Sequence, residues 1–133
     1  MRVDGQCHCG RIAYVAEVDP EQVYLCHCED CQSISGGAGR WAASVAVSDF
    51  RLIRGETRAY VKRSAAGTES HQHFCAHCAS PIYSTAPHKP EMVRLRVGTA
   101  NQRGDLPPRA EVWVRSAQPW ALTARDTKKL DRQ

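Results

Sequence analysis

Seven cysteines in three tight groups are the feature of this 133-residue sequence that most restricts its fold. No cysteine stands alone, and each group is spaced so that its sulfur atoms can meet at one ion. The groups are Cys7 with Cys9, then Cys26, Cys28 and Cys31, then Cys75 with Cys78. A C-x-x-C turn directs both sulfurs at one metal. A C-x-C loop can do the same where a glycine such as Gly10 relaxes the backbone.

The odd number of cysteines argues against a disulfide framework. Residues 1–10 show no apolar stretch of a signal peptide, and no apolar run is long enough to span a bilayer, so we expect a cytoplasmic protein. In a reducing cytoplasm, close cysteine pairs favour metal binding. A redox role for Cys75 and Cys78 is the alternative, but that motif needs a βαβ context, which we do not find.

The seven cysteines divide into a set of four and a set of three. Cys7, Cys9, Cys75 and Cys78 would complete a tetrahedral structural site. Cys26, Cys28 and Cys31 lie within six residues, and a site with three protein ligands keeps a fourth position for water or substrate. His27 could fill that position instead. Because ligands flank it on both sides, we expect its ring, like those of His8 and His77, to be exposed or bonded to the backbone.

The two sets close loops of very different length, which indicates different roles. A metal on the four-cysteine set closes a loop of more than sixty residues, so its binding free energy becomes folding free energy. The three-cysteine set closes almost no loop, which favours a chemical role. Two purely structural zinc ions remain an alternative, as does iron in place of zinc, because soft thiolates suit either metal.

Charge and composition restrict the partners. Hydrophobic residues are 42% and charged residues 24%, as in ordinary soluble domains. The net charge of +4 falls to +1 once seven thiolates and two zinc dications are counted, and the basic residues are spread along the chain. We therefore expect neither a membrane nor nucleic acid as the main partner. The sequence does not predict the oligomeric state.

Short segments rich in β-branched residues, separated by Gly, Pro, Asp and Asn, predict a mainly β fold. We expect one domain over residues 1–122 and a polar tail over 123–133. A short helical turn is expected at "EDCQS" (29–33). Val93, Leu95 and Val97 alternate with two arginines, so one strand face is buried. Trp113 and Trp120 are expected in the core. The expected strands cover residues 11–18, 39–47, 50–55, 58–63, 70–74, 80–86, 91–99 and 110–116.

The segments "GQCHCGRIAY", "LCHCEDCQSISG", "HFCAHCASPIY" and "EVWVRSAQPW" resemble, in this order, the glutathione-dependent formaldehyde-activating enzymes, a family that also contains centromere protein V. The resemblance runs from Gly5 to about Leu122. It implies a β-tent fold of small antiparallel sheets around two zinc ions, with the four-cysteine site structural and Cys26, Cys28 and Cys31 at the catalytic zinc. It also implies addition of glutathione's thiol to formaldehyde, giving S-(hydroxymethyl)glutathione, an activity classed as a carbon–sulfur lyase.

Three positions depart from the family pattern. Ala79 stands where the family has Gly, and Glu111 where many members have His. The loop Ser35–Gly39 has lost the family's aromatic residue, and we expect it to border the catalytic zinc. Arg40, just after this loop, is a candidate ligand for a glutathione carboxylate, with an ordinary surface residue as the alternative.

The sequence thus predicts a zinc-dependent carbon–sulfur lyase acting on a thiol–aldehyde adduct, with a small thiol such as glutathione as partner. A non-enzymatic zinc module that binds a protein or nucleic acid is one alternative. A thiol-based metal or redox sensor that uses Cys26, Cys28 and Cys31 is the other.

Overall fold

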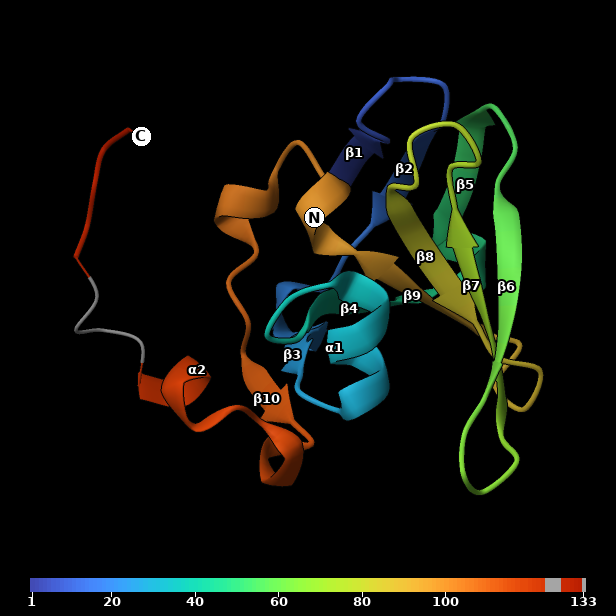
Figure 1. Cartoon of the computed structure of the whole chain (residues 1–133). Helices are drawn as coiled ribbons and strands as arrows, with labels where there is room; N and C mark the ends of the chain where they lie inside the picture. The colour runs from blue at the N-terminus through green and yellow to red at the C-terminus, as the bar shows by residue number, and fades with distance from the viewer. Residues whose placement is uncertain (124–127, 133) are drawn as a thin grey trace.

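The computed structural model describes residues 1–123 and 128–132, and these residues form two β-sheets with little helix (Figure 1). Ten strands lie in this part of the chain: β1 (Arg2–Gln6), β2 (Ala13–Glu17), β3 (Val23–Cys26), β4 (Arg40–Ala46), β5 (Phe50–Arg54), β6 (Arg58–Arg63), β7 (Glu69–Phe74), β8 (Pro81–Thr85), β9 (Met92–Arg96) and β10 (Ala110–Val112). The α-helices are α1 (Glu29–Ser35) and α2 (Pro119–Thr123). Short 3₁₀ turns follow β2, β4 and β9 and flank β10: Pro20–Gln22, Val47–Asp49, Val97–Thr99, Arg103–Asp105 and Val114–Ser116.

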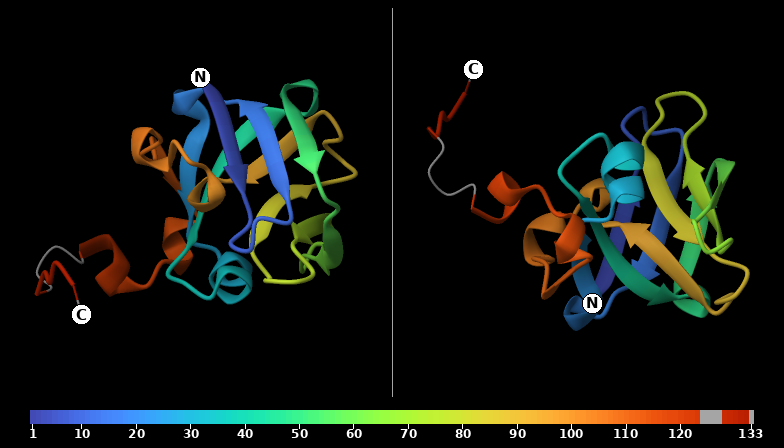
Figure 2. Two further views of the ribbon diagram at one scale, coloured as in Figure 1. Left: turned by 90° about the horizontal axis from the view of Figure 1, so that it is seen from above. Right: turned by 60° about the horizontal axis from the view of Figure 1, so that its bottom comes forward.

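The strands divide between a small sheet and a large one. The small sheet is antiparallel, in the order β1-β2-β5. The large sheet has seven strands in the order β10-β3-β4-β9-β8-β7-β6, and only the β10–β3 pair is parallel. Figure 2 shows the small sheet packed over the large one. The mainly β fold predicted from the sequence is therefore confirmed, with one small antiparallel sheet and one larger mixed sheet.

The core lies between the sheets. Val45, Val93 and Leu95 of the large sheet join one buried cluster with Val3 and Tyr14 of the small sheet, each at most 2% exposed. Successive strand residues point to opposite faces, so the alternation in β9 sends Val93 and Leu95 inward. The sequence prediction of one buried face in this segment is confirmed.

The other face of the large sheet is polar, and it carries the three-cysteine set. Residues paired across a ladder share a face, so the register can be followed strand by strand. Along β3, β4, β9, β8, β7 and β6 the residues on this face include Cys26, Arg40, Ser44, Arg94, Arg96, Ser84, Gln72, Ser70 and Lys62. The fold thus places a cysteine and the cationic side chains of three arginines and one lysine, from four strands, on one surface.

Helix α1 contacts β4 beside this surface (Figure 1). It begins after Cys28, whose sulfur accepts a hydrogen bond from the backbone N–H of Cys31 (3.3 Å) and so caps the helix. It ends at Gly36, which adopts φ 67°, a conformation that favours glycine. A salt bridge of 2.6 Å between Asp30 of α1 and Lys62 ties the helix to β6. The helical turn predicted at 29–33 is confirmed.

Two tryptophans contradict the prediction of core positions. Trp113 is 59% exposed and Trp120 is 61% exposed. The strand predicted over 110–116 ends at Val112, because Trp113 takes a left-handed conformation (φ 58°) and starts a 3₁₀ turn. The tail predicted over 123–133 falls partly on residues 124–127 and 133, which lie outside the described residues. Within the described part, no helix is long and apolar enough to cross a bilayer.

Candidate metal centres

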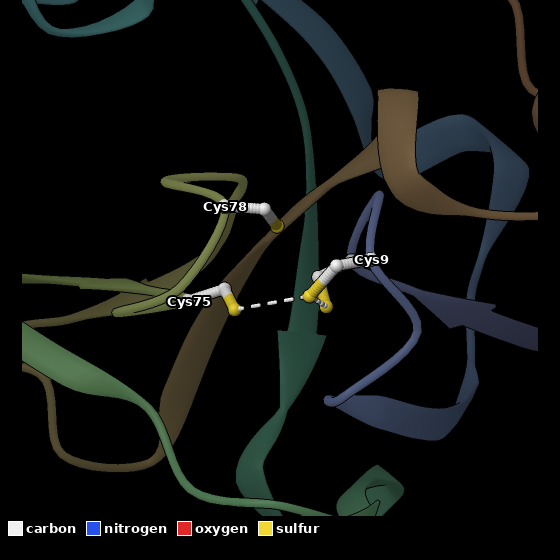
Figure 3. A group of neighbouring side chains, drawn as sticks. Cys9, Cys75 and Cys78 are labelled. Carbon is white, nitrogen blue, oxygen red and sulfur yellow. Dashed lines mark hydrogen bonds between the residues drawn. The ribbon is translucent and has the colours of Figure 1, made fainter.

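The four-cysteine set forms one compact cluster between the sheets, hereafter the first cluster. Its sulfurs, from Cys7, Cys9, Cys75 and Cys78, all lie within 4.8 Å of one another. Cys7 and Cys9 come from the β1–β2 loop of the small sheet, and Cys75 and Cys78 from the β7–β8 loop of the large sheet. Figure 3 shows Cys75 and Cys78 facing Cys9 across the gap between the two loops. The cluster therefore connects the two sheets.

Sulfur spacing in the first cluster fits a tetrahedral metal. Zinc–sulfur bonds of about 2.3 Å at tetrahedral angles place sulfurs about 3.8 Å apart. The Cys7–Cys9 distance between sulfurs is 3.5 Å and the Cys9–Cys75 distance is 3.8 Å. Both loops are held by backbone hydrogen bonds, from the N–H of Cys7 to the carbonyl of Ile12 (3.0 Å) and from the N–H of Cys75 to that of Ser80 (2.9 Å). The four sulfurs that a tetrahedral ion requires are thus present, and hydrogen bonds within the two loops hold them in place.

The second cluster consists of Cys26, Cys28 and Cys31, whose sulfurs also lie within 4.8 Å of one another. Cys26 ends β3, Cys28 caps α1 and Cys31 lies in the first turn of that helix. The Cys28–Cys31 and Cys31–Cys26 distances between sulfurs are 2.9 and 3.4 Å. The end of one strand and the start of one helix thus supply three sulfurs. These sulfurs can hold a soft metal ion and leave its fourth position open.

His27 is not in the second cluster, although it lies between two of its cysteines. Its ring is fully buried, with Nε2 3.4 Å from a carboxylate oxygen of Glu111 on the neighbouring strand β10. The backbone N–H of His27 donates to the carbonyl of Val112 (3.0 Å). The prediction of an exposed or backbone-bonded ring is wrong for His27, since its ring is buried beside β10. It is confirmed for His8 and His77, which are exposed.

A cavity of ≈ 170 Å³ opens at the second cluster. All three sulfur-bearing residues line it, together with residues from the polar face and two nearby loops: Arg40, Lys62, Ser70, Ala86, His88, Arg94 and Trp113. None of the described residues 35–39 lines this cavity. The glycine loop nevertheless lies against the second cluster, since a Cβ at Gly39 would lie 2.9 Å from the carbonyl oxygen of Cys26.

Acidity differs strongly between two sulfurs of the second cluster. The hydrogen bond that Cys31 donates lowers the pKa of Cys26 to about 5, and the positive charge of Arg40 acts in the same direction. The same contact raises the pKa of Cys31. Without metal, one sulfur is therefore a thiolate while its neighbour keeps a proton. A metal that binds both must displace this proton, so its affinity falls as the pH falls.

Arg96 lies on the same face of the large sheet as Arg94 and is only 6% exposed. Its guanidinium donates to the side-chain oxygen of Gln72 (2.5 Å) and to the carbonyl of Arg94 (3.2 Å). Burial, followed by the nearby charge of Arg40, lowers the pKa of Arg96 to about 9, so it remains a cation at neutral pH. A buried arginine with no carboxylate partner among the described residues is unusual, because burying an unpaired charge is costly.

Sequence reasoning grouped the cysteines as the structure does, and it named Arg40 among the residues around them. It missed Lys62, His88, Arg94 and Arg96, which come from distant strands and loops. One signal was available. Arg94 and Arg96 alternate with core residues within one strand, so both had to lie on the face of the sheet opposite the core.

The fold and its two clusters define a β protein that could hold two metal ions, one between four sulfurs and one between three. The chain belongs to the glutathione-dependent formaldehyde-activating enzyme family, whose family model matches residues 2–116. A Halomonas elongata protein, named as a candidate glutathione-dependent formaldehyde-activating enzyme, is 24% identical over 125 residues, covering 90% of this chain and 80% of that protein. A crystal structure of a Rhodobacter sphaeroides protein has a similar fold, with a TM-score of 0.64 and 22% identity over 82% of this chain and 99% of that one.

Proposed function

We propose that this protein is a zinc-dependent carbon–sulfur lyase of the S-(hydroxymethyl)glutathione synthase type, with its substrate site at the second cluster. Family membership associates the chain with glutathione-dependent formaldehyde activation. One observation carries the finer proposal. All three cysteines of the second cluster line a cavity shared with cationic side chains, whereas the first cluster already supplies four sulfurs. We assign zinc to both clusters, with the first structural, in a single domain over residues 1–122.

The reaction forms one carbon–sulfur bond. A thiol sulfur attacks the aldehyde carbon, the π electrons of the carbonyl move to oxygen, and the proton from the thiol ends on that oxygen. Zinc would supply a site that holds the thiol as thiolate or polarises the carbonyl. Cys26, Cys28 and Cys31 would hold this ion. Arg40, beside Cys26 in the sheet register, would offset negative charge at the sulfurs and contact the substrate.

Cys28→Ser is the variant that tests this assignment. Serine is a good helix N-cap, so the replacement keeps the cap of α1 while it removes a soft ligand. We expect the metal content to fall from two equivalents to one, the circular dichroism spectrum to stay unchanged, and the exchange rate between formaldehyde, glutathione and their adduct to drop at least about 100-fold. Exchange is measured by NMR with ¹³C-formaldehyde.

Arg51→Gln serves as the control, because Arg51 is exposed on β5 of the small sheet and should leave rate and metal content unchanged. A full exchange rate in Cys28→Ser would contradict the proposed site. A metal that remains bound and exchanges no ligand with added thiol would favour the non-enzymatic module instead. Reversible metal loss on mild oxidation, without any catalysis, would favour the sensor.

A further inference from the structure

The cavity at the second cluster carries an excess of positive charge. Arg40, Lys62 and Arg94 all line it, and no aspartate or glutamate among the described residues does. The charge of Lys62 is offset by Asp30 at 2.6 Å. The Nε atom of Arg40 is buried and lacks a hydrogen-bond partner. Among the described residues, neither arginine of the cavity wall forms an ion pair with a carboxylate.

A third arginine on the same face of the sheet adds to this excess. Arg96 is bonded to Gln72, which in turn donates to Ser70 (2.7 Å), a residue of the cavity wall. This chain of hydrogen bonds connects the buried Arg96 to the cavity, and its charge interacts with those of Arg40 and Cys31.

Counting charges shows what is missing. Three thiolates with one divalent metal leave a single negative charge, while Arg40, Arg94 and Arg96 carry three positive ones. Two further negative charges would balance the site. A substrate sulfur bound as thiolate supplies one of them, and a carboxylate on the same molecule would supply the other.

The three arginines are placed for different tasks. Arg40 pairs with Cys26 in the sheet register and Arg96 lies near Cys31, so both face the sulfurs. Arg94 pairs with Ser44 on one side and Ser84 on the other, two small residues that leave its guanidinium room at the cavity wall. Because Arg40 lies beside the cysteines and Arg96 is bonded to Gln72, we assign the ligand carboxylate to Arg94.

We propose that Arg94 is the specificity residue of this site and binds a carboxylate of the thiol substrate a few bonds away from the sulfur. The short separation follows from the cavity volume of ≈ 170 Å³, below the roughly 300–1,000 Å³ that hold a drug-sized ligand. The cavity has room for the sulfur and one acidic group, and the rest of a larger thiol would lie outside it. This inference rests on the proposed thiol-binding role of the second cluster.

The test compares two thiols of the same chain length that differ in their terminal group, 3-mercaptopropionate with a carboxylate and 3-mercaptopropanol with a hydroxyl, and uses propionate as the probe without sulfur. Cobalt(II) replaces zinc in the purified protein, so that thiol binding changes the visible spectrum and gives dissociation constants without any assay of activity. For the wild type we expect 3-mercaptopropionate to bind about 10- to 100-fold more tightly than 3-mercaptopropanol, as one charge-assisted pair gives. Propionate should bind weakly and leave the cobalt–thiolate bands of the protein itself unchanged.

Arg94→Gln should bring the ratio of the two dissociation constants close to one while the constant for 3-mercaptopropanol stays within about 2-fold. Arg94→Lys keeps the charge without the bidentate fork and should restore part of the ratio. Arg51→Gln on the small sheet is the control and should behave as the wild type. A wild type that binds both thiols equally would overturn the role of Arg94 and leave the proposed function standing. If neither thiol changes the cobalt spectrum, the proposed function fails and this inference fails with it.

Discussion

The Cβ atom of Ala79 makes the backbone conformation of this residue unfavourable. The residue follows the Cys75–Cys78 turn and adopts φ 62°, a left-handed conformation in which a Cβ meets the carbonyl oxygen. Its N–H donates to the carbonyl of Cys75 (2.8 Å), so the turn that directs two sulfurs inward requires this conformation. The resembled family has glycine at this position, and the positive φ gives the physical reason.

Ala79→Gly should therefore stabilise the metal-loaded protein. Relief of the left-handed strain, about 1–2 kcal/mol, exceeds the extra chain entropy of glycine, about 0.5–1 kcal/mol. We expect the thermal midpoint to rise by about 2–5 °C. The control is Ala59→Gly in the exposed strand β6, where glycine has only its entropic disadvantage and the midpoint should fall. Equal losses in both variants would contradict the strain.

At the scale of elements, the loop between α1 and β4 sets the position of the second cluster. The loop returns past the end of β3, where Gly39 lies so close to Cys26 that an added Cβ would meet its backbone oxygen at 2.9 Å. A Cβ added at Gly37 in the same loop would have room, because its nearest neighbour would be Ser35 Oγ at 3.8 Å. A side chain is therefore excluded at Gly39 and has room at Gly37.

Gly39→Ala should weaken the second metal site and leave the first intact. Because the contact is with backbone, Cys26 must shift, and we expect the affinity of the second metal to fall at least about 10-fold, with a loss of stability of about 1–3 kcal/mol. Competition with a chromophoric chelator resolves the two metal affinities. Gly37→Ala is the control and should match the wild type. A second-site affinity unchanged in Gly39→Ala would show that the loop does not hold Cys26 in place.

Strands with a clear local sequence pattern were predictable, and strands that depend on tertiary contacts were not. The strand β6 has the predicted bounds, and β9 shows the expected alternation, because a period-2 pattern reports a half-buried strand directly. β1 was missed because Asp4 and Gly5 are poor strand formers. Gly5 is there because a Cβ would meet the Tyr14 hydroxyl at 2.4 Å, a contact with another strand that no local pattern reveals.

The residues of the candidate site also divide into those that were predictable from local sequence and those that were not. Its cysteines were predictable because ligand spacing is local in sequence. The arginines were not, since the sheet order places β9 beside β4 and only this order brings Arg94 to the second cluster. Trp113 was predicted to be buried because tryptophan is usually well buried. Its left-handed backbone instead places an exposed ring at the rim of the cavity.

For the whole molecule, the first cluster lies between loops of the two sheets, which also pack on one shared hydrophobic core. The Gly5–Ala100 bridge, the hydrogen bond from Asn101 N–H to the Asp4 carbonyl (2.9 Å) and the Tyr14–Thr99 hydroxyl contact (3.1 Å) join the small sheet to the turn after β9. A structural zinc site contributes about 10–16 kcal/mol, as much as the roughly 5–15 kcal/mol that hold a typical domain folded. Loss of the first metal should therefore unfold the chain.

Cys78→Ser should abolish the folded state, in contrast to Cys28→Ser at the second cluster. Cys78 is half-buried, and its sulfur lies 3.2 Å from the Ser80 hydroxyl, so a serine fits the space and only the soft ligand is lost. We expect collapsed amide dispersion in the NMR spectrum and no cooperative thermal transition, while Cys28→Ser keeps both. In the wild type, stepwise chelation should remove the metal of the second cluster without unfolding the protein. Removal of the metal of the first cluster should coincide with unfolding. A folded Cys78→Ser protein with one metal would mean that packing between the sheets, rather than the metal, holds them together.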